Sequence, residues 1–265
     1  MKRVLITGAA DGIGAGAAAF LRQRGHPVAG LDLNAPNEEL IEADVSDQES
    51  VDAGVAEAVN RLGGLDAVVN NAGVGHVQDS GKPPEEDTEA LLQVNLLGAW
   101  RVTGAAMPHL LESHDARVVN VASGLAHLTP PYSAAYCASK RGIVAYSDAL
   151  RTEYRGRVSV TTVYPGYIRT AIHEGPSEKG IGLEGVVPAE PLESAAAAIT
   201  RAVLGPPRRD LATTRRGTAS YALLRLMPPA VVDRLIELAV RRMVSTRDMR
   251  ESELGGPLAE RLARR

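Results

Sequence analysis

Cysteine, aromatic residues and long apolar runs are scarce in this sequence. Cys137 is the single cysteine, so no disulfide can form within the chain. No apolar run approaches the roughly 20 residues that a membrane-spanning helix needs, and no charged segment followed by an apolar stretch opens the chain. We therefore expect a cytoplasmic protein without a transmembrane segment.

Aromatic residues make up only 3% of the chain, with one Phe and one Trp. Ala, Val, Leu and Ile must therefore fill the core, which disfavours a jelly-roll or immunoglobulin-like sandwich. The histidines lack the spacing of a metal site, so we expect no bound metal. They are His26, His76, His109, His114, His127 and His173.

The net charge of −3 at pH 7 conceals an uneven distribution. Residues 201–265 carry 14 of the 29 basic side chains, all of them Arg, but only 7 of the 32 acidic ones. A basic segment can bind nucleic acid or an anionic membrane surface. Because these arginines are interleaved with Asp and Glu, the pattern favours a solvated helical face, and we expect no nucleic-acid partner.

Short β-branched runs alternate with longer stretches of helix-forming residues. This alternation predicts an α/β protein with a parallel sheet covered on both faces, a three-layer α/β/α arrangement. We expect one domain over 1–265, with a core of 1–205 and a helical C-terminal extension of 206–265. The predicted strands are 3–7, 27–31, 65–69, 117–122 and 158–164, and the predicted helices are 15–24, 48–61, 87–113, 134–155 and 191–204.

Two later segments have distinct compositions. Residues 175–185 contain four glycines and no periodicity, which predicts a mobile loop that orders over bound ligands as a lid. Residues 231–244 place apolar side chains at helical spacing opposite charged ones. Four roles are open to this apolar face: covering an apolar substrate, packing on the sheet, contacting another subunit or resting on a membrane surface.

A glycine-rich turn connects the first predicted strand to the first predicted helix. Gly8, Gly12 and Gly14 have no Cβ to obstruct a pyrophosphate, and the helix N-terminus behind them offers unpaired N–H groups. Asp11 and Ile13 complete the turn. The spacing Gly-x-x-x-Gly-x-Gly differs from the usual Gly-x-Gly-x-x-Gly, so a purely structural turn is the alternative. Strand, turn, helix and strand within about 30 residues match the βαβ unit of a Rossmann-type doubly wound fold.

Asp32 ends the second predicted strand, 18 residues after Gly14. A carboxylate there can accept hydrogen bonds from the hydroxyls of an adenosine ribose, and it repels a 2′-phosphate. Asp44 and Val45, after the next strand, can meet the adenine ring. A strand-end acid facing water and an ordinary loop acid are the alternatives for Asp32 and Asp44. Together with Asp11, Asp32 favours NAD over NADP.

Tyr136 and Lys140 lie four residues apart on a predicted helix and therefore share one face. A phenol with a pKa of about 10 is a poor base at neutral pH. A nearby ammonium group and a cationic nicotinamide both favour the phenolate, so the pair can move a proton. A surface pair with the same spacing is the alternative for this isolated pattern.

Six motifs together resemble the short-chain dehydrogenase/reductase family in their order and spacing. The resemblance covers roughly residues 1–200, and no motif of the family follows residue 205. The motifs are Thr7-Gly-Ala-Ala-Asp-Gly-Ile-Gly14, Asn70-Asn-Ala-Gly73, Asn95, Ser123, Tyr136-x-x-x-Lys140 and Pro165-Gly-Tyr-Ile-Arg-Thr170.

The resemblance implies catalytic roles for four residues. Ser123 would donate a hydrogen bond to the substrate oxygen, and Tyr136 would exchange the proton with it. Lys140 would hold the cofactor ribose and lower the pKa of Tyr136. Asn95 would bend its helix so that a backbone carbonyl binds a water molecule of a proton relay. Hydride transfer belongs to the cofactor, so the protein supplies orientation and a proton path.

The resemblance also implies cofactor contacts and assembly. One group of residues would support the sheet and the adenosine ribose, and a second group would line the nicotinamide. The helices near 87–113 and 134–155 would pair subunits in a homodimer or homotetramer. The first group is Asn71, Ala72 and Gly73, and the second is Pro165, Gly166, Ile168 and Thr170.

The sequence therefore predicts an NAD-dependent oxidoreductase that interconverts a secondary alcohol and a ketone, with an apolar small-molecule substrate. A non-catalytic NAD-binding sensor or scaffold is one alternative, but it does not need Ser123, Asn95, Tyr136 and Lys140 together. A nucleotide-sugar epimerase is another. It would share the Tyr-x-x-x-Lys pair but would resemble Thr-Gly-x-x-Gly-x-x-Gly at the turn.

Overall fold

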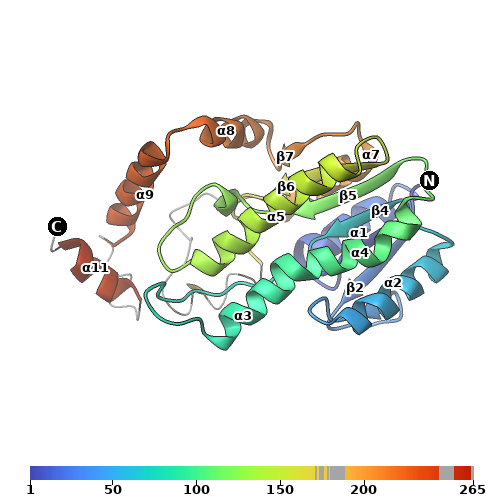
Figure 1. The fold of residues 1–265 in the computed structure, drawn as a ribbon, viewed down its shortest axis with the longest axis horizontal. Coiled ribbons are helices and arrows are strands. Elements are labelled where there is room, and N and C mark those ends of the chain that lie inside the picture. Colours follow the sequence, from blue (N-terminus) through green and yellow to red (C-terminus); the bar gives the residue numbers. More distant parts are fainter. Residues whose placement is uncertain (171, 173–175, 178, 180–188, 245–253, 264–265) are drawn as a thin grey trace.

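Seven parallel strands form one sheet in the described part of the chain (Figure 1). The computed structural model describes residues 1–263 except 171, 173–175, 178, 180–188 and 245–253. The strand order is β3-β2-β1-β4-β5-β6-β7, and every neighbouring pair is parallel. The order reverses between β1 and β4, where a doubly wound sheet opens a crevice for ligands. The predicted Rossmann-type α/β fold is confirmed.

The strands are short and apolar, as expected for strands that helices cover on both faces. All residues of β1, β4 and β5 are buried. The strands are β1 (Val4–Thr7), β2 (Val28–Asp32), β3 (Leu40–Glu42), β4 (Ala67–Asn70), β5 (Ala116–Val121), β6 (Val158–Tyr164) and β7 (Asp210–Ala212).

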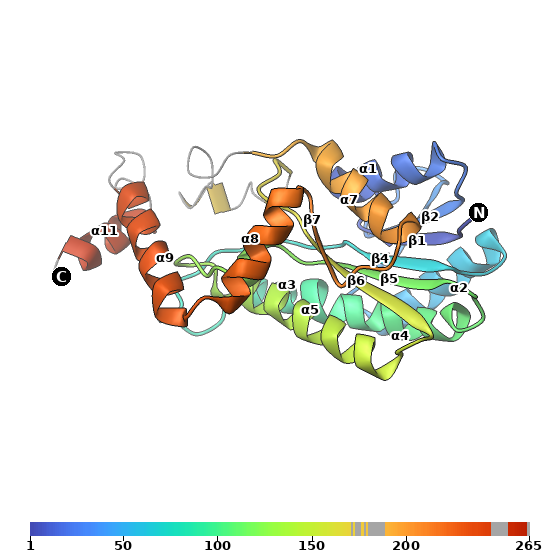
Figure 2. The same cartoon turned by 90° about the horizontal axis from the view of Figure 1, so that it is seen from above.

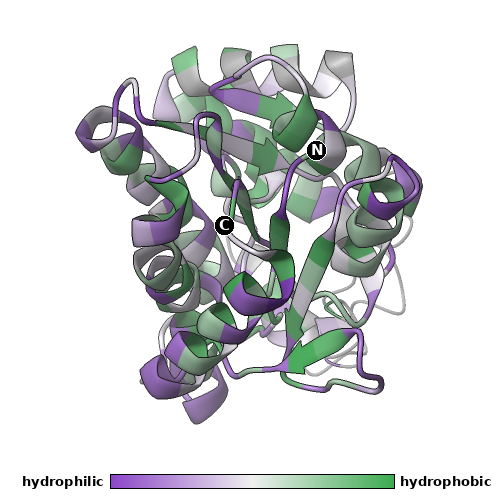
Figure 3. Ribbon diagram, turned by 90° about the vertical axis from the view of Figure 1, so that its right-hand side faces the viewer, coloured by the Kyte–Doolittle hydropathy of each residue, from purple (hydrophilic) through white to green (hydrophobic). Residues whose placement is uncertain are grey.

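Helices form a layer on each face of the sheet (Figure 2). On one face α1 and α7 lie side by side, and on the other lie α2, α4 and α5. In Figure 3 the strands are mostly hydrophobic, whereas the helices mix hydrophobic and hydrophilic residues, as helices with one buried face do. The helices are α1 (Gly12–Arg22), α2 (Gln48–Leu62), α4 (Ala99–Leu110), α5 (Ala134–Glu153) and α7 (Leu192–Leu204).

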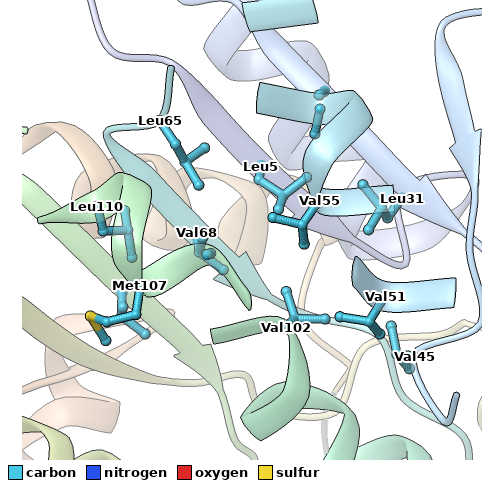
Figure 4. Close-up of a cluster of buried hydrophobic side chains, with 14 of the residues drawn as sticks. Leu5, Leu31, Val45, Val51, Val55, Leu65, Val68, Val102, Met107 and Leu110 are labelled. Carbon is cyan, nitrogen blue, oxygen red and sulfur yellow. The ribbon is translucent and has the colours of Figure 1, made fainter. Parts of the chain in front are cut away.

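Two apolar clusters, one on each face of the sheet, form most of the core. Leu5 of β1 packs in the cluster with Val55 of α2 and Val102 of α4 (Figure 4). The next residue, Ile6, belongs to the second cluster with Ile199 of α7. Successive strand residues therefore point to opposite faces, and each fully buried side chain of this size stabilises the fold by about 1.5–3 kcal/mol.

The predicted helix 87–113 is divided into three parts. It consists of α3 (Glu86–Leu92), the π-helical turn η1 (Gln93–Gly98) and α4. A wider turn of this kind does not interrupt the run of helix-forming residues, so sequence periodicity cannot locate it.

The C-terminal extension was expected to be helical from residue 206, but it first contributes the edge strand β7. Three residues, Asp-Leu-Ala, are too few to show a strand pattern. The helices α8 (Arg215–Leu226), α9 (Pro229–Val244) and α11 (Gly255–Ala263) then lie beyond the carboxyl edge of the sheet (Figure 1). In α9, Val240 packs against Val77 and Tyr132, so the extension covers loops of that edge.

The segment 175–185, expected to be a mobile lid, lies outside the described residues except for 176, 177 and 179. Among the residues that the structure describes, no helix is long and apolar enough to cross a membrane. Within the same residues, no three His, Cys, Asp or Glu side chains gather as metal ligands would.

The side chain of Thr7 joins β1 to the loop after β4, where the strand order reverses. Its hydroxyl oxygen accepts hydrogen bonds from the backbone N–H groups of Asn71 and Ala72, both at 3.0 Å. In return, the side-chain amide of Asn71 donates to the carbonyl oxygens of Thr7 and Gly8, both at 3.1 Å. Thr7 is buried, so these bonds hold the glycine turn against the end of β4.

Replacing Thr7 tests this contact. Thr7→Val should lower the free energy of unfolding by about 3 kcal/mol, because a methyl group replaces the acceptor of two backbone N–H groups. The control Thr7→Ser keeps the acceptor and should lower it by about 1 kcal/mol, the contribution of one buried methyl group. Urea unfolding followed by circular dichroism measures both variants. Equal losses in the two variants would show that the hydroxyl does not hold the turn.

Candidate active site

A cavity of about 450 Å³ opens at the carboxyl edge of the sheet. It lies across the ends of β1, β2, β4, β5 and β6, where the strand order reverses and open α/β sheets bind ligands. Of the predicted site residues, Gly14 and Asn95 lie outside its lining. Those that line it are Gly8, Asp11, Gly12, Ile13, Asp32, Asp44, Val45, Asn71, Ala72, Gly73, Ser123, Tyr136, Lys140, Pro165, Gly166, Ile168 and Thr170.

The glycine turn after β1 forms one part of the cavity wall. Gly8 and Gly12 have φ angles of 66° and 56°, which residues with a side chain rarely adopt. A Cβ on Gly14 would overlap the carbonyl oxygen of Gly8. Asp11 caps α1 and accepts a hydrogen bond from the N–H of Gly12 at 2.5 Å. The turn thus leaves open space at the positive end of the α1 dipole, which fits a pyrophosphate.

Acidic side chains follow β2 and β3 along the cavity. Asp32 accepts a hydrogen bond from the backbone N–H of Ala10 at 2.8 Å, which fixes its carboxylate beside the glycine turn. Asp44 accepts hydrogen bonds from the N–H and the hydroxyl of Ser46, both at 2.7 Å. Among the described residues that line the cavity, Lys140 is the only cation. Carboxylates in this position can accept hydrogen bonds from ribose hydroxyls.

Lys140 on α5 is buried in the cavity wall, with only 4% of its surface exposed. Its Nζ donates a hydrogen bond to the carbonyl oxygen of Val121 at 3.1 Å and lies 5.6 Å from the centre of the Tyr136 ring. Burial lowers the pKa of Lys140 to about 8, because water no longer solvates the ammonium group. The structure therefore excludes the surface pair that the spacing alone allows.

Tyr136 is a phenol with a strongly raised pKa. Burial raises the pKa of Tyr136 to about 12, and a hydrogen bond with Ser123 opposes part of this rise. The net shift is opposite to the lowering expected beside Lys140, because lost solvation of the phenolate outweighs the other contributions. At neutral pH Tyr136 holds its proton and can donate it.

Ser123 and Tyr136 meet because the segment between them folds back. Ser123 follows β5 and caps the short helix η2 (Gly124–Ala126), where its Oγ accepts a hydrogen bond from the N–H of Leu125 at 3.2 Å. Tyr136 lies in the first turn of α5. Between them, Tyr132 has a φ of 65°, a left-handed conformation that is uncommon for a residue with a side chain.

Asn95 lies in the π-helical turn and holds the loop after β4. Its amide oxygen accepts a hydrogen bond from the N–H of Val74 at 2.8 Å, and its amide nitrogen donates to the carbonyl oxygen of Val74 at 2.9 Å. A Cβ on Gly73 would stand 3.2 Å from Asn95 Oδ1 and 3.6 Å from Lys140 Nζ. Asn95 therefore places this loop beside Lys140. Its part in a proton relay stays a prediction.

The segment after β6 closes another side of the cavity. Thr170 lies over the glycine turn, with its Cγ2 3.4 Å from the position that a Cβ of Gly12 would occupy. Gly166 has no space for a side chain, because a Cβ there would stand 2.6 Å from Glu190 Oε1. Pro165 and Ile168 of the same segment also line the cavity. The resemblance places the nicotinamide along this segment.

The remainder of the cavity is lined by residues that the sequence patterns do not single out. Gly124 had a signal, since a glycine directly after Ser123 suggests a close approach by another group. Tyr221 of α8 had none, because it lies beyond the last family motif. The remaining apolar residues resemble ordinary core positions in the sequence, and they include Leu31, Val74, Val94, Leu125, Leu128 and Ile172.

Comparison with known proteins finds similar oxidoreductases. The oxidoreductase UcpA of Salmonella typhimurium is 35% identical over 188 residues, which are 65% of this chain and 72% of the relative. D-threitol dehydrogenase of Mycolicibacterium smegmatis is 34% identical over 221 residues, 75% of this chain and 84% of the relative. The solved structure of ligand-free aldohexose dehydrogenase from Thermoplasma acidophilum has a TM-score of 0.73 at 23% identity. The match covers 86% of this chain and 96% of that protein's chain, and it supports the fold alone.

The family model for short chain dehydrogenases matches residues 2–179, which include the glycine turn, Ser123, Tyr136 and Lys140. The match therefore covers every strand that lines the cavity. This chain belongs to the short-chain dehydrogenase family.

Proposed function

We propose that this protein interconverts a secondary alcohol and a ketone with NAD as its cofactor. The observation that carries the proposal is the meeting of Ser123, Tyr136 and Lys140 in the wall of one cavity. Members of this family are oxidoreductases that bind a nicotinamide cofactor. A protein that only senses or displays NAD does not need two hydroxyl groups beside a buried ammonium group.

Ser123 and Tyr136 hold the reacting oxygen of the substrate in the proposed reaction. Their hydroxyl groups donate hydrogen bonds to the ketone oxygen, where negative charge develops during reduction. Tyr136 gives its proton to this oxygen, and in the oxidation it takes a proton from the alcohol. The bound cofactor supplies or accepts the hydride. Because the pKa of Lys140 is lowered to about 8, its ammonium group can pass a proton toward Tyr136 near neutral pH.

The preference for NAD rests on the charge of the cavity wall. A 2′-phosphate on the adenosine ribose would meet the carboxylates of Asp32 and Asp11, both of which line the cavity. Leu33, the residue after β2, is 61% exposed and offers no positive charge. Repulsion by Asp32 and Asp11 therefore favours the cofactor without the phosphate.

The cavity wall beyond Ser123 and Tyr136 supports an apolar substrate. It includes the side chains of Val74, Leu125 and Leu128. An alcohol or ketone with a hydrocarbon skeleton would bury its apolar surface against them.

We also propose that the protein forms a homodimer or homotetramer and acts in the cytoplasm. Trp100 on α4 is 57% exposed, and its ring stacks on Tyr146 of α5 with centroids 4.8 Å apart. An aromatic surface of this kind is typical of subunit contacts, and it lies on the helices that the resemblance assigns to assembly.

Replacing Tyr136 with Phe tests the proposed acid/base role. Tyr136→Phe keeps the ring but removes the proton, so kcat for alcohol oxidation should fall by about 10² or more. Absorbance at 340 nm measures the rate, and NADH fluorescence should show unchanged cofactor binding. The control Tyr132→Phe changes a nearby tyrosine outside the cavity lining and should keep its rate. A Tyr136→Phe variant with near-wild-type turnover on the same alcohol would refute the assignment.

Replacing Asp32 tests the proposed cofactor preference. The wild type should prefer NAD over NADP by roughly 30- to 150-fold in kcat/KM, since about 2–3 kcal/mol of repulsion should survive screening by water and salt. Asp32→Ala should lose most of this preference. Asp47→Asn removes a carboxylate that caps α2 outside the cavity lining, and it should keep the preference. Equal use of both cofactors by the wild type would place the ribose elsewhere.

A further inference from the structure

The C-terminal extension contributes one side chain to the cavity, the phenol of Tyr221. It is the only lining residue after position 172 among the described residues. The N-terminus of α8 is fixed by Thr214, whose Oγ1 accepts a hydrogen bond from the N–H of Gly217 at 2.9 Å. The strand β7 before it pairs with β6 in the sheet. The pairing of β7 with β6 therefore fixes where α8 begins, and with it the position of Tyr221.

Aromatic packing fixes the Tyr221 ring. Its centroid lies 5.6 Å from the His127 ring and 5.6 Å from the Tyr164 ring, both in tilted contacts. A Cβ on Gly124 would overlap the Tyr221 hydroxyl oxygen. The hydroxyl therefore stands against the backbone of Gly124, one residue from Ser123, and only a glycine leaves space for it.

The Tyr221 hydroxyl has no hydrogen-bond partner among the described residues, whereas the neighbouring Tyr164 hydroxyl donates to Asp210 Oδ1 at 2.9 Å. Tyr221 lines the cavity, and a tyrosine hydroxyl that is taken out of water usually has a hydrogen-bond partner. Burial and the negative charge of Glu190 raise the pKa of Tyr221. Tyr221 therefore keeps its proton at physiological pH and is available as a hydrogen-bond donor.

We infer that Tyr221 binds a second oxygen of the substrate, next to the oxygen held by Ser123 and Tyr136. The Tyr221 hydroxyl lies against Gly124, the residue after Ser123, so we assign this second oxygen to the carbon next to the reacting carbon. The substrate class is then a vicinal diol, or the corresponding hydroxyketone, on an otherwise apolar skeleton. The inference rests on the proposed function, because it takes Ser123 and Tyr136 as the partners of the reacting oxygen.

A comparison of matched alcohols tests the inference. The probes are trans-cyclohexane-1,2-diol against cyclohexanol and butane-2,3-diol against butan-2-ol, each with NAD. Tyr221→Phe keeps the ring and removes the donor, so kcat/KM for the diols should fall about tenfold, the effect of one hydrogen bond. The values for the mono-alcohols should stay within about twofold of wild type, since they lack the second oxygen.

The control is Tyr164→Phe. It removes a hydroxyl that donates to Asp210, from a ring that contacts Tyr221, and it should leave the ratio of kcat/KM for diols to that for mono-alcohols unchanged. Gly124→Ala should displace Tyr221 and lower activity on both classes of alcohol, because the added Cβ would overlap the Tyr221 hydroxyl. Adding Tyr221→Phe removes this overlap and should restore part of the activity on the mono-alcohols but not on the diols. An equal loss on diols and mono-alcohols in Tyr221→Phe, or no loss on either, would overturn the inference and leave the proposed function intact. A wild type that oxidises neither class would instead overturn the proposed function and this inference with it.

Discussion

The common direction of the strands is the constraint from which the site follows. Because β1, β2, β4, β5 and β6 are all parallel, their carboxyl ends meet at one edge of the sheet. This arrangement brings Gly8, Asp32, Asn71 and Ser123 to one cavity although they span more than a hundred residues of sequence. The connections from this edge also place the N-terminus of α1 and the first turn of α5 there. The parallel pairing of the strands is therefore sufficient to bring the carboxylate, the hydroxyl groups and the N-terminus of α1 together.

Loss of solvation sets the pKa values of Tyr136 and Lys140, the two functional residues on α5. Lys140 is buried and Tyr136 is half-buried, and the loss of solvation favours the neutral form of each: the pKa of Tyr136 rises to about 12 and that of Lys140 falls to about 8. The two pKa values therefore move apart, so Tyr136 holds its proton more tightly than Lys140 does and can take one from the Lys140 ammonium group. The carbonyl of Val121 steadies the ammonium group, and Asn95 holds the loop that packs beside it. The C-terminal extension adds Tyr221 to the lining of the same cavity.

Local patterns in the sequence predict most of the fold and much of the site. Strand and helix alternation, the glycine turn and the Tyr136 to Lys140 spacing depend on neighbouring residues. The structure has the predicted alternation, and the turn, Tyr136 and Lys140 line one cavity. What the sequence misses depends on the tertiary path of the chain. The π-helical turn at Asn95 leaves the run of helix-forming residues intact, and β7 is too short to form a pattern. Tyr221 reaches the cavity only because β7 directs α8 there, and the upward pKa shift of Tyr136 follows from burial that spacing does not show.

The pH dependence of the two reaction directions tests the central claim most directly. If Tyr136 exchanges the proton, kcat/KM for alcohol oxidation at saturating NAD rises with pH, because only the deprotonated phenol accepts a proton. In the same buffers, kcat/KM for ketone reduction at saturating NADH falls with pH, because only the protonated phenol donates one. With pKa values of about 12 for Tyr136 and about 8 for Lys140, both changes extend above neutral pH. Opposite slopes are the result that the account predicts, and profiles that are flat, or that run in the same direction for both reactions, would contradict it.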